Sequence, residues 1–507
     1  MATENPADQP KNNQAVPSPA EVICVLKKQA SAGDIYEIIS LNQGEQGGKP
    51  SFTLHRASYA ESDNDGNKTL QRLFEDFGIN GPPAHLQPGP QRRVHVIVST
   101  LSGTGLSVQF YDSVLAPLLE AVGLTTAGES EPRDAEQQGS YHLLITQDAG
   151  SVKNFARGLA DQAHGESNAK HTVVLLSGDG GVIDMLNGYT AATDSADIAP
   201  GHEADPQSLP LVAILPLGTG NALFSSLHKT VKSPAASDLV HGLRTLLRGK
   251  AAPLPSFKVV FPEGSRTITY SEVQEPAPTS SDSLETAGST PSLEEQTGDV
   301  THLYGVVVAS YGFHSQLVWE SDTPAYRRHG AARFQMVAQE LLKESHAYRA
   351  TVEMARPAAG GEAAGTERLG RDRHAYILAT PVSNLEKTFC ISPASRPLDG
   401  QLRLVHFEPV GGAKTMEIMM AAYDGGKHID MRWGGPAEGG QGQGEGDGRV
   451  GYEDISELRI TTHEQDARWR KVCIDGTIVE IPTDGCMVVR KETRRHLEVL
   501  VDETISY

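Results

Sequence analysis

Hydrophobic residues from position 94 onward alternate between short β-rich runs and longer segments with helical spacing. The predicted strands, some of which continue through glycines into helices, are VHVIVST (94–100), YHLLITQ (141–147), HTVVLLSGDGG (171–181) and LPLVAILPLGTGNALFSSLHK (209–229). Apolar residues recur at helical intervals in 107–123 and 151–163. Strands that alternate with helices predict an α/β fold with a doubly wound parallel sheet. Such sheets bind ligands at the carboxyl ends of their strands, which is where the glycines fall.

The residues before this pattern have a different character. Residues 1–19 are polar and rich in proline, and we expect them to be disordered. Residues 20–90 carry three strand-like runs, a helical run (LQRLFEDFGI, 70–79) and a Pro/Gly stretch. They predict a small β-rich extension followed by a linker. The α/β domain is therefore expected to span 91–240.

Residues 241–507 predict a second, antiparallel β-rich domain. Its predicted strands include SFKVVFP (256–262), HLYGVVVASYGF (302–313), HAYILAT (374–380) and HLEVLVD (496–502), and a helix is predicted within 332–348. Three stretches rich in small and polar residues are expected to be disordered insertions, near 273–300, 357–370 and 434–449.

Composition narrows the classes of protein that the chain can belong to. The formal net charge of −20 argues against a nucleic-acid-binding protein and against adhesion to an anionic membrane by charge alone. The four cysteines, Cys24, Cys390, Cys473 and Cys486, form no CxxC pair, so we expect reduced thiols in a cytoplasmic protein. The sequence shows no secretory signal and no run of 18 apolar residues, so any contact with a membrane is expected to be peripheral.

Glycine-rich turns follow three of the predicted strands. The first, Ser102-Gly103-Thr104-Gly105, lets the backbone approach a phosphate, but it lacks the spacing of a P-loop, and an ordinary βα turn explains it equally well. The second, SGDGG (177–181), places Asp179 between glycines at the end of a strand. Such a carboxylate can bind Mg²⁺ or accept a proton from a substrate hydroxyl, or it can simply cap a helix.

The third turn is PLGTGN (216–221). Gly218, Thr219 and Gly220 can direct backbone N–H groups at phosphate oxygens, while Asn221 either fixes the loop or reaches a nucleotide. A tight turn capped by the asparagine is the structural alternative. The predicted nucleotide-binding residues are completed by Gly178 and Gly180 of the second turn and by Thr146 in the second strand.

Together, SGDG, the segment from Asp184 to Gly188 and LPLGTGNAL resemble the catalytic domain of sphingosine kinases and diacylglycerol kinases. The resemblance is strong over about 92–230 and weaker over 300–500. YRRHGAARF (326–334) is similar to the family pattern YRRxGxxRF, whose first and third arginines reach nucleotide phosphates, which implies this role for Arg327 and Arg333. CIDGT (473–477) resembles the DGE segment of the family, which implies that Asp475 lies at the nucleotide and holds the metal, either directly or through water.

The sequence departs from the family pattern at several positions. Gly181 replaces the threonine of GDGT, Thr477 replaces the glutamate of DGE, and Ala222 replaces an aspartate of bacterial relatives. In YGFHSQLVWES (311–321), which we expect to be a lipid-facing strand, Gln316 and Val318 stand where sphingosine kinases place acids that recognise the sphingoid head group.

The resemblance implies transfer of a phosphoryl group from ATP with Mg²⁺ to a lipid hydroxyl at a membrane surface. Residues 91–240 would be the nucleotide-binding catalytic domain, with Asp179 as the base, and residues 241–507 the lipid-binding domain. The residues expected to line a slot for the lipid, although plain core packing also explains the apolar ones, are Phe313, Gln316, Leu317, Phe334, Val337 and Leu341.

A sphingoid base is the preferred substrate, and four alternatives stay open. The first two are a diacylglycerol kinase and a ceramide kinase. The third is an NAD kinase, which shares the glycine-aspartate loop but acts on a soluble substrate. The fourth is a nucleotide- or lipid-binding regulator with an eroded site, to which Gly181, Thr477 and Val318 point. Assembly into a homodimer is left open.

Overall fold

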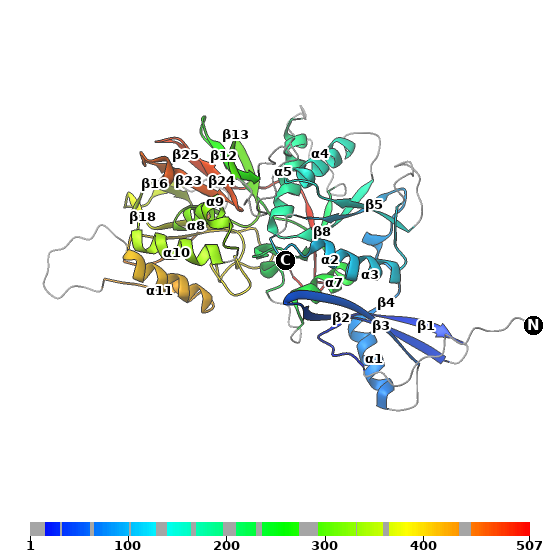
Figure 1. Ribbon diagram of the computed structural model, residues 1–507. Coiled ribbons are helices and arrows are strands. Elements are labelled where there is room, and N and C mark those ends of the chain that lie inside the picture. Colours follow the sequence, from blue (N-terminus) through cyan, green and yellow to red (C-terminus); the bar gives the residue numbers. More distant parts are fainter. Residues whose placement is uncertain are drawn as a thin grey trace, which may run out of the picture. The chain divides into compact units, whose positions relative to one another are not determined.

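The computed structural model describes residues 16–30, 33–60, 65–100, 103–127, 139–163, 169–195, 209–229, 236–272, 293–330, 332–357, 365–434 and 448–506. The chain forms two compact units (Figure 1). Unit 1 comprises Met1–Leu254 and Arg494–Tyr507, and unit 2 comprises Pro255–Thr493. The boundary expected at 240/241 therefore lies at 254/255, and the last residues of the chain return to the first unit.

A sheet of mostly parallel strands forms the centre of unit 1, as the alternating pattern predicts. In the described part of the chain its order is β10 (Lys250–Pro253), β26 (Glu498–Val501), β9 (Leu211–Pro216), β8 (Lys170–Ser177), β5 (Arg92–Val98), β7 (Ser140–Ile145) and β6 (Thr125–Thr126). Neighbouring strands from β26 to β6 run parallel, and β10 is antiparallel to β26. The carboxyl ends of β5, β8 and β9 consequently meet at one edge.

Helices cover both faces of this sheet. The helical elements of unit 1 outside the extension are α2 (Ser107–Phe110), the π-helical turn η2 (Tyr111–Leu115), α3 (Ala116–Ala121), α4 (Ser151–Ala163), α5 (Asp179–Ser195), α6 (Ala222–Leu227) and α7 (Asp238–Arg248). Leu176 shares a buried core with Leu118 of α3 and Leu243 of α7. Leu175, which points to the opposite face, lies against α5. Figure 1 shows α5 side by side with α4.

The N-terminal extension is a second, four-stranded sheet in the described residues, with the order β3 (Lys49–Ala60), β2 (Gly33–Gln46), β1 (Val22–Ala30) and β4 (Gly78–Ile79). Ile23, Ile39 and Phe52 pack into the core of the α/β part, whereas Val25 and Ile38 pack with α1 (Asp65–Phe77) on the other face. The stretch expected to be a linker contains the short 3₁₀ turn η1 (Ala84–Leu86). The extension is thus an integral part of unit 1.

Unit 2 consists of two largely antiparallel sheets. The first has, among the described residues, the order β14 (His302–Gly305), β11 (Phe257–Val260), β25 (Cys486–Lys491), β22 (Glu457–Thr462), β16 (Tyr348–Ala355) and β17 (Thr366–Arg368), and β18 (Arg373–His374) also pairs with β16. The second has the order β13 (Leu293–Asp299), β12 (Arg266–Glu272), β24 (Thr477–Glu480), β23 (Lys471–Ile474), β15 (Ala309–Gly312), β19 (Tyr376–Thr380), β20 (Leu402–Phe407) and β21 (Gly451–Ile455).

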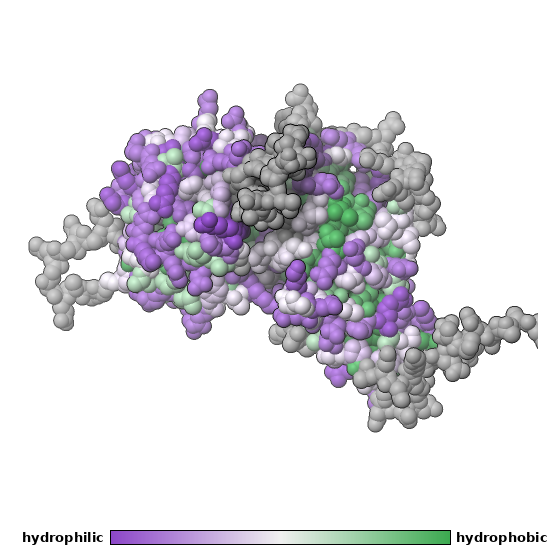
Figure 2. Space-filling model, in the orientation of Figure 1, coloured by the Kyte–Doolittle hydropathy of each residue, from purple (hydrophilic) through white to green (hydrophobic). Residues whose placement is uncertain are grey.

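The helical elements of unit 2 are α8 (Phe313–Asp322), α9 (Pro324–Arg327), α10 (Ala332–Glu344), α11 (Gly411–Tyr423) and the 3₁₀ turns η4 (Lys427–Asp430) and η5 (Ala467–Arg470). α10 packs against both α8 and α11. Among the described helices, none has both the length and the apolar character needed to cross a bilayer. Figure 2 shows hydrophilic residues over most of the face in view.

Three expectations about local structure are wrong. The lipid-facing segment 311–321 is mostly the helix α8, which starts directly after Gly312, a residue with a φ of +96°. Residues 293–299, expected to be disordered, form β13, and 366–368 form β17. The strand expected within 496–502 joins the parallel sheet as β26 instead of the antiparallel domain. The other expected disordered stretches, at 1–15, 273–292, 358–364 and 435–447, lie outside the described residues.

Candidate active site

A cavity of about 360 Å³ opens at the carboxyl ends of β5, β7, β8 and β9. Most of the residues predicted at the nucleotide line it, together with the predicted base Asp179, namely Gly103, Thr146, Gly178, Gly180, Gly218, Thr219 and Gly220. Ser102 lies outside the described residues. The sheet therefore brings together three glycine turns that are spread over more than 100 residues of the sequence.

Direct backbone contact explains why glycines occupy these turns. A Cβ atom on Gly218 would lie 2.3 Å from the Cα of Gly178, and one on Gly103 would lie 2.1 Å from the Oγ1 of Thr219. Thr104, which does not line the cavity, donates from Oγ1 to the carbonyl oxygen of Leu217 at 2.5 Å. The first and third turns are thus joined by a hydrogen bond, and the third turn lies directly against the second.

Asp179 is held by the start of another helix. Its carboxylate accepts hydrogen bonds from the backbone N–H groups of Ala222 (2.7 Å) and Leu223 (2.9 Å), so it caps α6. Burial raises the pKa of Asp179 above its ordinary value, while the hydrogen bonds from Leu223 and Ala222 act in the opposite direction. The capping function that competed with the catalytic one in the sequence is therefore present, and the carboxylate still lines the cavity.

Asn221 and Thr146 stabilise the walls of the cavity. Asn221 adopts a left-handed conformation (φ +49°), accepts from the N–H of Gly218 at 3.0 Å and donates to the carbonyl oxygen of Gly218 at 2.9 Å. This geometry favours a loop-fixing role over contact with a nucleotide. Thr146 is buried and its Oγ1 accepts from the N–H of Thr100 at 2.9 Å. That bond ties the end of β7 to the residues after β5.

Asp184 is a charged residue of this cavity that the sequence analysis did not single out. It lies on α5, one and a half turns after Asp179. Burial raises its pKa from 3.8 to about 6, and Lys153 opposes this shift. The sequence did contain a signal for Asp184, because it begins the Asp184–Gly188 segment that resembles the kinase family. Gly188, at the end of this segment, lets α5 pack closely against α4, since an added Cβ would lie 2.3 Å from the carbonyl oxygen of Lys153.

The charge of this cavity is one-sided. Its described lining contains three carboxylates, Asp148, Asp179 and Asp184, and no lysine, arginine or histidine.

Gly181 is explained by packing, because a Cβ there would lie 2.7 Å from Ser177 Oγ and 3.0 Å from Leu175 Cδ2. A threonine would not fit at this position without a shift of its neighbours.

Arg327 and Arg333 lie together in unit 2, where both face the carboxylate of Asp322. Arg327 makes a two-pronged ion pair with Asp322, with Nε–Oδ1 and Nη2–Oδ2 distances of 3.0 and 2.8 Å, and donates from Nη1 to the carbonyl oxygen of Tyr270. Arg333 Nη1 lies 3.7 Å from Oδ1 of the same aspartate, and its Nε is buried without a hydrogen-bond partner among the described residues. Phosphate contact by these arginines stays a prediction.

Asp475 has a structural role in this conformation. With Gly476 it forms the tight turn between β23 and β24, and both residues have positive φ values (49° and 89°). Its carboxylate accepts from the backbone N–H groups of Val306 (2.6 Å), Val307 (3.0 Å) and Val308. The geometry gives no support to Asp475 as a direct metal ligand, because backbone donors occupy both oxygens. The described residues contain no group of three or more Asp, Glu, His or Cys side chains that could hold a metal ion.

The residues predicted at the lipid lie on the two packed helices α8 and α10. Phe313, Gln316, Val337 and Leu341 are buried, and Leu317 and Phe334 are half-buried. The Gln316 amide nitrogen donates to Glu320 Oε1 at 2.6 Å, while its own Oε1 is buried with no hydrogen-bond partner in the described part of the chain. This helix pair therefore combines apolar side chains with one unsatisfied acceptor.

Comparisons with known proteins agree with the glycine turns. Residues 93–254 match the family described as diacylglycerol kinase catalytic domain, and this match ends where the first segment of unit 1 ends. No curated protein matches the chain significantly.

Two solved structures from Bacillus anthracis str. Sterne have a similar chain path. One, described as a diacylglycerol kinase, is 12% identical with a TM-score of 0.42, and the similarity covers 82% of this chain and 98% of that one. The other, named as a candidate diacylglycerol kinase, is 14% identical with a TM-score of 0.46, covering 82% of this chain and 96% of that one. Residues 93–254 are therefore identified as a diacylglycerol kinase catalytic domain, the catalytic domain of a family of lipid kinases.

Proposed function

We propose that this lipid kinase uses ATP with Mg²⁺ to phosphorylate the primary hydroxyl of a sphingoid base. The glycine turns would bind the nucleotide, because their exposed backbone N–H groups suit phosphate oxygens. The hydroxyl oxygen would form the new bond to the γ-phosphorus, the bond from that phosphorus to the β–γ bridging oxygen would break, and ADP would leave. Asp179 would take the hydroxyl proton and orient the hydroxyl for attack.

The charge of the cavity supports a requirement for a cation. Three carboxylates face the space that would receive an anionic triphosphate, and the described lining offers no positive side chain to offset them. Mg²⁺ is typically held by one or two carboxylates together with substrate phosphates, which suits this donor set. Asp184 is the carboxylate that we expect to hold it, because it lines the cavity and Asp179 is assigned to the proton transfer. The ion would neutralise charge on the phosphates.

The unsatisfied acceptor of Gln316 carries the choice of substrate. A buried carbonyl oxygen without a donor costs free energy, and a ligand that donates a hydrogen bond removes this cost. Glu320, which accepts from Gln316 and pairs with Arg468 at 2.9 Å, adds a carboxylate beside it. A sphingoid base offers an amine and two hydroxyls as donors. Diacylglycerol offers a single hydroxyl, which is the group that reacts, so it has no second donor for Gln316.

A surface of α11 supports contact with a lipid bilayer. Six large apolar side chains are exposed in the described residues, and three of them, Met416, Met420 and Tyr423, lie on this helix. Their spacing of four and three residues places them on one face of the helix. α11 packs against α10, which carries predicted lipid-binding residues. We propose that this face rests on the membrane from which the lipid substrate is taken.

The test is a substrate panel with radiolabelled ATP. The full chain would receive a sphingoid base, a ceramide, a diacylglycerol or NAD, each with Mg²⁺, and the products would be separated by thin-layer chromatography. We expect label in the sphingoid base, and a loss of about tenfold or more in kcat/KM for that lipid in Gln316→Leu. Label in diacylglycerol or ceramide alone would overturn the substrate, and label in NAD alone would overturn the lipid. ATP binding without phosphoryl transfer to any of these substrates would favour a nucleotide- or lipid-binding regulator without kinase activity.

A further inference from the structure

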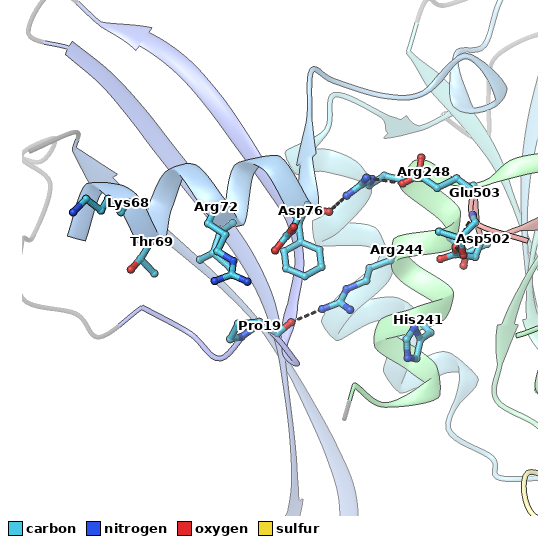
Figure 3. A pocket seen from close by; sticks show the side chains of 15 residues that line it. Pro19, Lys68, Thr69, Arg72, Asp76, His241, Arg244, Arg248, Asp502 and Glu503 are labelled. Carbon is cyan, nitrogen blue, oxygen red and sulfur yellow. Dashed lines mark hydrogen bonds and ion pairs between the residues drawn. The ribbon is translucent and has the colours of Figure 1, made fainter. Parts of the chain in front are cut away.

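A larger cavity, of about 890 Å³, lies in unit 1 and shares no lining residue with the candidate active site. It is bounded by α1 of the extension, by α7 and by the residues that follow β26 (Figure 3). Its volume is in the range of small-molecule sites in proteins. Since α1 precedes the matched catalytic domain and α7 belongs to it, a ligand here would contact both parts of unit 1.

Basic side chains face this cavity from both helices. α1 contributes Lys68 and Arg72, and α7 contributes Arg244 and Arg248, one helical turn apart. Like charges at this spacing repel each other. Burial and the neighbouring Arg248 lower the pKa of Arg244 to about 10, against the attraction of Asp502. In a chain with a net charge of −20, this is a local concentration of positive charge.

The arginines of α7 are already held in place by the protein. Arg244 donates to the carbonyl oxygens of Val22 (2.8 Å) and Pro19 (2.5 Å), and its guanidinium lies 4.3 Å from the ring centre of Phe77. Arg248 donates to the carbonyl oxygen of Asp76 and pairs with Glu503 at 2.5 Å. These contacts fix the two guanidinium groups at the wall of the cavity.

Acidic groups on the wall only partly offset this charge. The lining includes three carboxylates, Asp76, Asp502 and Glu503. Glu503 is engaged with Arg248, and Asp502 accepts from the N–H and the hydroxyl of Thr504 at 2.9 and 2.6 Å. Glu503 and Asp502 therefore already accept hydrogen bonds from neighbouring residues of the protein.

Arg72 differs from the α7 arginines. It is exposed, and the described residues offer it no hydrogen bond or ion pair. In Figure 3 its side chain extends from α1 into the space between the two helices, into which Arg244 extends from the other side. Thr69 and Thr245 add hydroxyl groups to the lining, and Leu73 and Phe77 add apolar surface.

We propose that this cavity is a second ligand site, which binds a phosphate monoester between Arg72 of α1 and Arg244 of α7. Guanidinium groups match phosphate oxygens in geometry and retain their charge at neutral pH. The phosphate relieves the repulsion between the basic side chains, and the apolar surface accepts the organic part of the ligand. Bound there, the ligand ties the extension to the catalytic domain.

The test measures binding of defined probes to the full chain by calorimetry. The probes are glycerol 3-phosphate, inorganic phosphate, and phosphatidylcholine vesicles with and without phosphatidic acid. Each titration is done with saturating ATP analogue and Mg²⁺, so that the glycine turns are occupied. The variants are Arg72→Glu and a matched control, Arg157→Glu, which reverses an exposed arginine on α4 outside the cavity. Equal melting temperatures of the two variants show that neither has lost its fold.

We expect at least one probe to bind, with an affinity that falls tenfold or more in Arg72→Glu and stays unchanged in Arg157→Glu. Saturation by glycerol 3-phosphate or inorganic phosphate identifies a soluble ligand, and binding only of vesicles that contain phosphatidic acid identifies a lipid head group. The proposal is overturned if no probe binds, or if Arg72→Glu and Arg157→Glu bind equally well.

Discussion

Gly178 and Gly218 contact each other through their backbones, so that a Cβ on either would lie less than 3 Å from the Cα of the other. The two residues come from turns 40 positions apart, one after β8 and one after β9, and β8 and β9 are neighbours in the parallel sheet. The absence of side chains at both positions sets the distance between the two turns. Because Asp179 follows one glycine and Thr219 the other, this contact also positions the groups at the cavity.

Gly218→Ala is expected to reduce catalysis without unfolding the protein. The added Cβ must move the two turns apart, and displacements of about 1 Å at reacting groups can cost about 10²-fold in rate. We expect kcat/KM for ATP to fall by at least about tenfold in steady-state assays. Gly158→Ala on α4 is the control, since nothing lies within 4 Å of its added Cβ, and it should keep wild-type kinetics. Wild-type kinetics in Gly218→Ala would contradict the contact.

Asp179→Asn should lower turnover by at least about 10²-fold, because it removes a preorganised charge and the proposed base. It should also weaken the cap of α6, since an amide can offer only one acceptor oxygen to Ala222 and Leu223. That loss is expected to cost about 1 kcal/mol.

Ser237→Ala separates these two effects. It removes the cap of α7, where Ser237 Oγ accepts from the N–H of Val240 at 3.3 Å, and it should lower stability by a similar amount while turnover stays unchanged. Turnover and urea unfolding are measured on both variants. If Asp179→Asn keeps full turnover, Asp179 has no part in the chemistry.

Asp184→Asn should stabilise the protein in a pH-dependent way. The folded-state pKa of Asp184 is raised from 3.8 to about 6, so its ionisation costs stability as the pH rises through this window, and the full cost is present above it. Removing the charge should therefore raise the free energy of unfolding by roughly 1–3 kcal/mol at pH 8, and by much less at pH 4.5. Urea unfolding at the two pH values measures the difference.

The same variant tests the metal assignment. If Asp184 holds Mg²⁺ with the phosphates of ATP, Asp184→Asn should need several-fold more Mg²⁺ for half-maximal activity. Titration of Mg²⁺ at fixed ATP gives this value. An unchanged requirement for Mg²⁺ would assign the ion to another ligand, while the stability result would stand independently.

Met420→Asp should weaken binding to lipid vesicles. Met420 is 57% exposed, so a charge there is tolerated by the fold but penalised at an apolar membrane interior. We expect several-fold less protein to sediment with vesicles, and a lower rate on vesicle-borne substrate. Val260→Asp changes an exposed apolar residue of β11, 39% exposed, and should sediment like the wild type. Equal sedimentation of both variants would exclude the α11 face.

The parallel sheet and its glycine turns could be predicted because the information is local. Each buried strand is a continuous apolar run, and each turn carries glycines where strand becomes helix. The convergence of Gly103, Asp179 and Thr219 then follows from the geometry of parallel strands alone. The cavity lined by these residues shows that this reasoning was sufficient.

Features that depend on distant partners could not be predicted. The apolar alternation of 496–502 suits a strand in either unit, and only pairing with β9 decides between them. The short segment Phe313–Asp322 is rich in bulky apolar residues, and its helix depends on where β15 ends at Gly312. The pKa of Asp184 depends on burial by the folded turns, which helical periodicity does not reveal.

The discontinuity of unit 1 has a consequence for synthesis on the ribosome. β26 lies between β9 and β10, yet it is made about 240 residues after β10 and about 280 residues after β9, when all of unit 2 has already been synthesised. Until then β9 has an open edge and β10 lacks its partner strand, so the nascent kinase carries an unpaired, apolar sheet edge. The enzyme can complete unit 1 only at the end of translation, and deletion of β26 should leave a chain that aggregates or recruits chaperones.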